Sequence, residues 1–141
     1  MTDIVVTVPQ HCWEGWLHEG SLPGDICPPG VEYYWFSRAA RPRIEPGERV
    51  YVVAFGRLRG YAPLVRIETL DEAVRRWSHK KDLSLPPPAS WWWPGATWAL
   101  VRRGEAVACT IRETITSHPG WCYRFWRRDI DETPFPGWRE P

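Results

Sequence analysis

The chain has 141 residues, the usual size of one domain, and its 43% hydrophobic and 25% charged residues exclude a disordered protein. Its formal net charge of +1 argues against a domain that wraps duplex DNA by charge alone, because such domains are much more basic. Neither a signal peptide nor an apolar stretch of about 20 residues is evident, so we expect one cytoplasmic domain over residues 1–141 with no membrane contact.

Two residue counts are unusual, namely 11 tryptophans and 15 prolines. Each indole carries a large apolar surface and one N–H group that needs an acceptor. A domain this small does not bury eleven such rings without leaving some edges or faces exposed. Several tryptophans are therefore expected to contact a ligand, a partner or solvent.

The first part of the chain predicts a strand, a short helix and a loop before its second strand. The expected elements are a buried strand at residues 4–8, a helix after Pro9 with Trp13 on its apolar face, a loop at 21–30 and an extended segment at 31–36. A turn at 45–48 then begins the clearest strand, residues 49–55, which we expect to pair as a hairpin with residues 60–68 after a reversal at 56–59.

The second part predicts a capped helix, a long loop and another hairpin. Thr69 is expected to cap a helix at 70–77, whose acidic first turn and basic last turn suit the helix dipole. A loop at 78–95 follows, then a hairpin of residues 98–102 and 106–112, an aromatic and basic segment at 120–128, and a coil from residue 129. Short strands with few helices predict an α+β, β-rich fold, a small barrel with short helices in its connections.

One stretch, Tyr34-Trp35-Phe36-Ser37-Arg38-Ala39-Ala40-Arg41, followed by residues 44–52 and 60–62, resembles the PUA-like superfamily with its EVE, YTH and ASCH branches. These branches share a loop, a turn of proline or lysine, glycine and an acid, a strand, and a second strand that begins with glycine. The resemblance covers about a third of the chain. It implies a small PUA-like β-barrel whose cleft holds RNA or a flipped, often modified, base.

The candidate ligand-binding residues are tryptophans in or beside loops together with the polar residues near them. A base has a π-face to stack on and a patterned edge to read, while arginine suits phosphate. The alternative is that the rings plug the ends of the barrel and the arginines are merely solvated. The set comprises Trp35, Ser37, Arg38, Arg41, Trp91, Trp92, Trp93, Trp121 and Arg124.

No catalytic residue, metal or cofactor is expected. The four cysteines include no C-x-x-C pair and the four histidines have no zinc-ligand spacing, so we expect reduced thiols. His11, Glu14 and His18 lie on the first predicted helix, but they match no hydrolase or metalloprotease motif.

The leading hypothesis is a module that binds nucleic acid, either RNA or modified DNA, through an unpaired, flipped or modified base in an aromatic cleft flanked by arginines. Two alternatives stay open. One is a small hydrolase, a nuclease or nucleoside amidohydrolase, on an ASCH-like fold. The other is a module that binds a protein partner through residues 91–93 and the prolines around them.

Overall fold

The structure is a computed structural model that describes residues 2–8, 10, 13, 32–78, 95–103, 106–116 and 120–141. The expected first helix and the loops at 21–30 and 78–95 lie mostly or wholly outside these residues. The described elements are β1 Ile4–Thr7, β2 Glu32–Ser37, β3 Arg49–Ala54, β4 Arg57–Thr69, α2 Leu70–Ser78, β5 Trp98–Arg103, β6 Val107–Thr110, β7 Trp121–Tyr123, α3 Arg128–Asp131 and β8 Thr133–Pro134.

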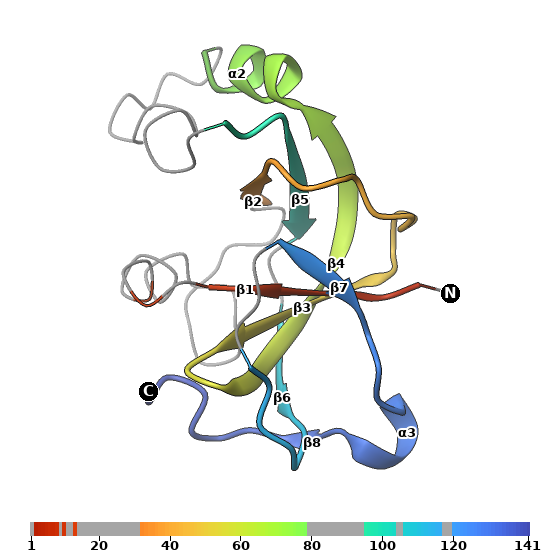
Figure 1. Cartoon of the computed structure of the whole chain (residues 1–141), viewed down its shortest axis with the longest axis vertical. Coiled ribbons are helices and arrows are strands. Elements are labelled where there is room, and N and C mark those ends of the chain that lie inside the picture. Colours follow the sequence, from red (N-terminus) through yellow and green to blue (C-terminus); the bar gives the residue numbers. More distant parts are fainter. Residues whose placement is uncertain are drawn as a thin grey trace.

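The described strands form one sheet in the order β2-β5-β4-β3-β1-β7, with β6 paired to β4 and β8 paired to β6. β1 and β3 are parallel, whereas the other pairs are antiparallel. The sheet curls into a half-barrel, with α2 at one end and α3 at the other (Figure 1). The prediction of a β-rich α+β fold with short helices in its connections is confirmed.

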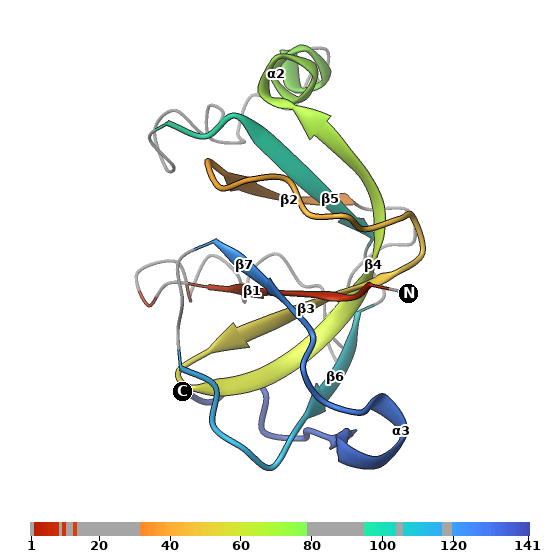
Figure 2. The same ribbon diagram turned by 45° about the vertical axis from the view of Figure 1, so that its right-hand side comes forward.

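The 13-residue strand β4 joins the two parts of the sheet. Its first part pairs with β3 and β6, and its last part pairs with β5. The β4–β5 register shifts between Leu64 and Arg66, and β4 sweeps through a wide curve (Figure 2). Because a bulge bends a strand and increases its twist, this irregularity helps β4 to turn the sheet.

The predicted hairpin of residues 98–102 and 106–112 is wrong. β5 pairs with β2 and β4, β6 pairs with β4 and β8, and the two strands do not pair with each other. Instead they follow one another along the same edge of β4, first opposite Thr69 to Leu64 and then opposite Tyr61 and Gly60. The local sequence indicates that a segment forms a strand, but it does not indicate which strand it pairs with. Here β4 is long enough to pair with both β5 and β6.

The predicted β3–β4 hairpin is confirmed, although its turn comes earlier than the expected reversal at 56–59. Ala54 pairs with Arg57, so the turn consists of Phe55 and Gly56. Both have positive φ, 49° and 71°, as a two-residue turn of the primed type requires. The Phe55 ring meets the Trp13 ring edge-on at 5.2 Å between centroids, which places this unusual turn residue against the core.

Helix α2 begins as predicted, with a capping box. The backbone N–H of Glu72 donates to Thr69 Oγ1 at 3.2 Å, and the Thr69 N–H donates to Glu72 Oε1 at 3.3 Å. These two bonds satisfy donors that a helix N-terminus otherwise leaves without partners.

The prediction of coil from residue 129 is wrong in part, because the tail contains the short elements α3 and β8. Trp138 is buried in the main core with Trp13, Trp35 and Trp98. The guanidinium of Arg59 is fully buried, and its Nη1 donates to the carbonyl oxygens of Trp138 at 3.3 Å and residue 140 at 2.5 Å. A buried arginine bound to carbonyl groups thus fastens the tail to the turn of the β3–β4 hairpin.

Candidate nucleic-acid interface

Residues 38–43 follow β2 without regular secondary structure, and we call this segment the arginine loop. Two indoles hold its backbone from the side of the core. Trp98 Nε1 donates to the carbonyl oxygen of Ala39 at 2.6 Å, and Trp121 Nε1 donates to that of Ala40. Since consecutive carbonyl groups are bound from β5 and β7, the position of the loop is set by regular structure on both sides.

The strand β7 also contacts the arginine loop near its ends. The Arg43 backbone N–H donates to Tyr123 Oη at 3.2 Å. A Cβ added at Gly120, which has φ +71°, would lie only 3.1 Å from the Ala39 Cβ. Glycine therefore allows both the turn before β7 and the close approach of the loop.

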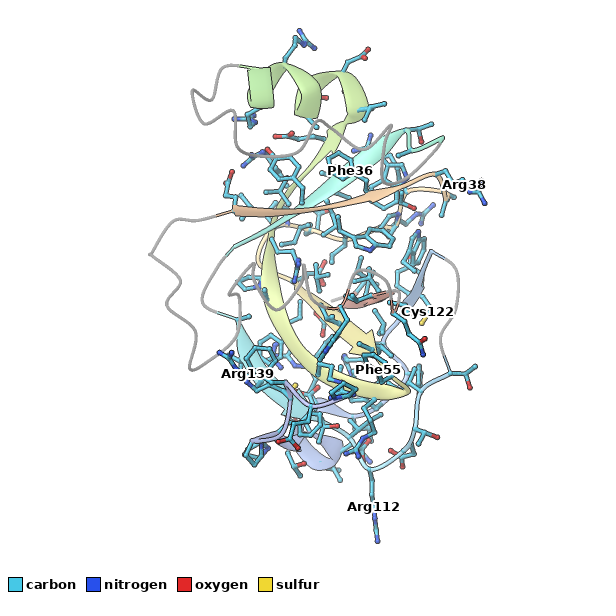
Figure 3. All side chains as sticks on the ribbon, turned by 90° about the vertical axis from the view of Figure 1, so that its left-hand side faces the viewer. Phe36, Arg38, Phe55, Arg112, Cys122 and Arg139 are labelled. Carbon is cyan, nitrogen blue, oxygen red and sulfur yellow. The ribbon has the colours of Figure 1, made fainter. Side chains whose placement is uncertain are left out.

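The arginine loop carries three exposed guanidinium groups, those of Arg38, Arg41 and Arg43, around the buried Pro42. None of the three forms a side-chain hydrogen bond or an ion pair within the described residues. Arg41 acts electrostatically on Glu72 without pairing with it. Arg38 projects away from the ribbon at the edge of the sheet (Figure 3). The loop is therefore a concentration of unneutralised positive charge on a fixed backbone.

Trp35 and Ser37 lie on the inner side of β2, directly before the arginine loop. Trp35 is 9% exposed and packs at 6.0 Å from the Trp98 ring, although the sequence suggested a contact residue that packing does not require. It packs because alternation along β2 turns it inward while Tyr34 and Phe36 face α2. Trp35 Nε1 is buried and has no acceptor in the described structure.

Ser37 is buried too, and its Oγ accepts a hydrogen bond from the backbone N–H of Ala39 at 3.0 Å. This bond fixes the direction in which the chain leaves β2. Ser37 therefore shapes the start of the arginine loop, whatever further contact its hydroxyl makes.

Arg102 is a buried arginine on the same inner face, which sequence reasoning missed. It is 4% exposed. β2 and β5 pair with Trp35 opposite Leu100, so Arg102, two residues further along β5, shares the face of Trp35. The alternation of Trp98, Leu100 and Arg102 was the available signal, since it places a charge on an otherwise apolar side of a strand.

The remaining candidate ligand-binding residues do not lie together. Trp121 is half-buried, with its ring edge-on to Tyr123 at 4.8 Å, and it belongs to the arginine loop through its indole N–H. Arg124 belongs to a different cluster, because its Nε donates to Asp3 Oδ2 at 3.0 Å. Trp91, Trp92 and Trp93 lie outside the described residues. Of the candidate residues, Ser37, Arg38, Arg41 and Trp121 thus lie in or against the arginine loop, and Trp35 lies beneath it in the core.

The described thiols are poor nucleophiles. Burial raises the pKa of Cys109 to about 12, and burial also raises the pKa of Cys122, so both are neutral near pH 7. Across the described ranges, no group of three or more His, Cys, Asp or Glu side chains is placed to hold a metal ion. No helix in that part of the chain is long and apolar enough to cross a membrane.

No protein-family model and no curated protein matches the sequence. Among solved structures, the chain is similar to ASCH from Zymomonas mobilis with a TM-score of 0.48 and 12% sequence identity, over 90% of this chain and 89% of that one.

Proposed function

We propose that this protein is a nucleic-acid-binding module that holds a single strand of RNA or modified DNA on the arginine loop. The observation that carries the proposal is the presentation of three exposed guanidinium groups on a backbone bound by two indole N–H groups. A planar guanidinium donates in pairs to phosphate oxygens. The loop arginines form no ion pair with a described carboxylate, so a phosphate that binds them has no such ion pair to displace.

The adjoining inner face of β2 supports recognition of an unpaired, flipped or modified base. Trp35 and Ser37 precede Arg38 on one side of β2 and are both buried, so a base from a strand bound to Arg38 reaches them only where the covering side chains move aside. The N–H of Trp35 is a buried donor without an acceptor in the described residues, and such a donor costs about 1–3 kcal/mol. A carbonyl oxygen or ring nitrogen on the edge of a base is an acceptor of the kind this donor lacks.

Fluorescence anisotropy with a labelled single-stranded oligonucleotide tests the phosphate contacts. The double variant Arg38→Gln/Arg41→Gln is expected to bind at least about tenfold more weakly than the unmodified protein, because two charge-assisted contacts are lost. The matched control is Arg112→Gln/Arg127→Gln, which removes the same charge from two other exposed arginines. Equal weakening by the two double variants would show that only net charge matters and would refute the assignment to the loop.

The base contact is tested separately. The single strand is expected to bind about tenfold more tightly than a duplex of the same sequence, since only an unpaired base reaches β2. Trp35→Phe keeps an aromatic ring but removes the N–H, so it should reduce this preference. If the duplex binds as tightly as the single strand, the base contact is wrong while the phosphate contacts stand.

A further inference from the structure

A cavity of about 290 Å³ lies between the strands β4 and β6 and the segment that contains α3 and β8. It shares no lining residue with the arginine loop. Its charged lining residues are Arg49, Arg128, Asp129 and Glu132. The hydrogen bonds around the two arginines show what kind of ligand this cavity suits.

Arg49 is held firmly, yet most of its donors are unused. Its guanidinium carbon lies 3.9 Å from the centre of the Tyr61 ring. Nη1 donates to Tyr51 Oη at 3.1 Å and to Glu132 Oε1 at 3.3 Å. A guanidinium has five N–H groups, and the Nε and Nη2 groups of Arg49 have no acceptor in the described part of the chain.

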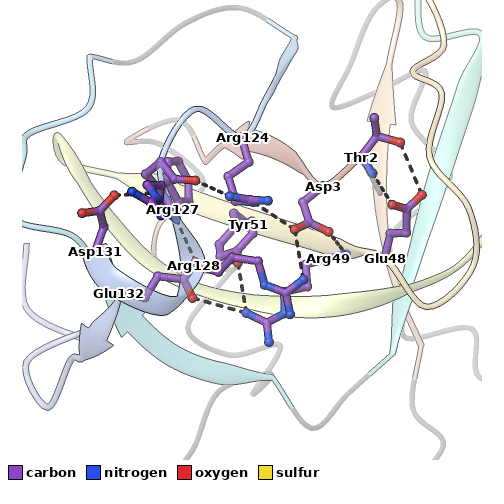
Figure 4. Close-up of polar contacts among 11 residues, drawn as sticks. Thr2, Asp3, Glu48, Arg49, Tyr51, Arg124, Arg127, Arg128, Asp131 and Glu132 are labelled. Carbon is purple, nitrogen blue, oxygen red and sulfur yellow. Dashed lines mark hydrogen bonds and ion pairs between the residues drawn. The ribbon is translucent and has the colours of Figure 1, made fainter.

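Glu132 forms an ion pair with Arg49 through Oε1, and its other oxygen accepts hydrogen bonds from two neutral donors. Tyr51 Oη donates to Glu132 Oε2 at 2.6 Å, and Trp126 Nε1 donates to the same oxygen at 2.8 Å. Burial, and then the bond to Glu132, raise the pKa of Tyr51, so the phenol stays protonated as a donor. These bonds join β3, the segment after β7 and α3 (Figure 4).

Asp3 is occupied in the same way, which leaves Arg128 poorly paired. Asp3 is 2% exposed and accepts from the backbone N–H of Arg49 at 2.9 Å and from Arg124 Nε at 3.0 Å. Arg128 Nη1 lies 3.6 Å from Asp3 Oδ2, too far for a hydrogen bond. Arg128 has no side-chain hydrogen bond to any described residue.

The charged residues that line the cavity are two arginines and two acids, and the pairing among them is uneven. Three arginines, Arg49, Arg124 and Arg128, face two carboxylates, those of Asp3 and Glu132. Exposed Asp129 also borders the cavity, but it forms no ion pair with either arginine there. Two guanidinium groups with unused donors therefore face one cavity from different elements, β3 and α3.

We propose that this cavity binds the phosphate group of a small organic phosphate. A phosphate dianion matches two guanidinium groups in charge and offers oxygens to both. Val107, Ala108 and Pro134 also line the cavity and give an apolar wall for the organic part of the ligand. The proposal is independent of the arginine loop, since either site can bind its ligand without the other.

Isothermal titration calorimetry of the full chain with adenosine 5′-monophosphate tests the proposal, with adenosine and inorganic phosphate as further probes. The monophosphate is expected to bind at least about tenfold more tightly than adenosine, and inorganic phosphate should compete with it. Arg128→Gln should weaken monophosphate binding about tenfold, whereas Arg112→Gln, at an exposed arginine outside the cavity, should leave it unchanged.

Equal binding of adenosine and its monophosphate would overturn the proposal, as would equal weakening by Arg128→Gln and Arg112→Gln. Loss of monophosphate binding in Arg38→Gln/Arg41→Gln would also overturn it, because the phosphate would then lie on the arginine loop. If thermal unfolding shows that Arg128→Gln is destabilised, Arg128→Lys replaces it. Lysine keeps the charge but loses the fork, so binding should still weaken severalfold.

Discussion

Two groups of arginines in this protein differ in the acceptors around them. In the arginine loop, the guanidinium groups are exposed and form no ion pair with a described carboxylate. Around Asp3 and Glu132, which we call the acid cluster, guanidinium groups pack against rings and two carboxylates. The same residue type is therefore tied to carboxylates and rings in one place, where only part of its donors is left for a ligand, and is exposed in the other. The difference between the two groups arises from the hydrogen-bond acceptors close to each arginine. Substitutions that remove one acceptor or donor at a time test this explanation.

The largest effect is expected for Asp3→Asn. Asp3 is almost fully buried and accepts from Arg49 and Arg124, so neutralising it leaves partly buried guanidinium groups with less compensation. Because the arginines keep some exposure to solvent, we expect a loss of about 2 kcal/mol, below the range for a fully buried pair. Urea unfolding measures this change.

Glu113→Gln is the control for Asp3→Asn, since Glu113 is an exposed acid without an ion pair to any described residue. Its effect should stay within about 0.5 kcal/mol. A similarly small effect of Asp3→Asn would show that the acid cluster does not hold the fold.

A smaller effect that depends on pH is expected for Tyr51→Phe. The lost hydroxyl joins Arg49 to Glu132, and its removal should cost about 1 kcal/mol at pH 7. Burial and then Glu132 raise the pKa of Tyr51 above its ordinary value of 10.0. A raised pKa in the folded state means that this stabilisation is complete below pH 10.0 and declines at higher pH.

Urea unfolding at pH 7 and pH 11 separates this contribution from those of other groups. The difference in unfolding free energy between the unmodified protein and Tyr51→Phe should shrink at the higher pH. A difference that stays constant would mean that the folded state does not hold the phenol in its protonated form.

The local elements were predictable because each depends on neighbours in the chain. The β3–β4 hairpin follows from two strand-forming runs on either side of a turn, and the Thr69 cap follows from a threonine placed just before a helix with an acidic first turn. The partners of β5 and β6 were not predictable in this way. They depend on the length and curvature of β4, which local alternation does not reveal.

The candidate site was predictable only in part, for a related reason. Arg38 and Arg41 were found because they follow an aromatic strand. Arg124 pairs with Asp3, which lies 121 positions away in the sequence, so no local sequence pattern predicts this pair. Buried Arg59 likewise depends on carbonyl groups from the hairpin and the tail. The role of an arginine is thus set by acceptors that the fold brings from elsewhere in the chain.

The smallest effect on stability is expected for Arg38→Gln/Arg41→Gln. Both side chains are exposed and pair with no described residue, so the unfolding free energy should change by no more than about 0.5 kcal/mol. The same urea titration as for Asp3→Asn checks this expectation. A loss comparable to that of Asp3→Asn would erase the distinction between the two groups of arginines.

The salt dependence of single-strand binding tests the central claim most directly, because it counts the phosphates that the protein neutralises. The logarithm of the association constant, plotted against the logarithm of salt concentration, should have a slope shallower by about 0.7 for each loop arginine removed. Arg38→Gln/Arg41→Gln is therefore expected to reduce the slope by about 1.4, and Arg112→Gln/Arg127→Gln to leave it unchanged. An unchanged slope in the loop variant would contradict the account, since the arginine loop would then not touch the phosphates.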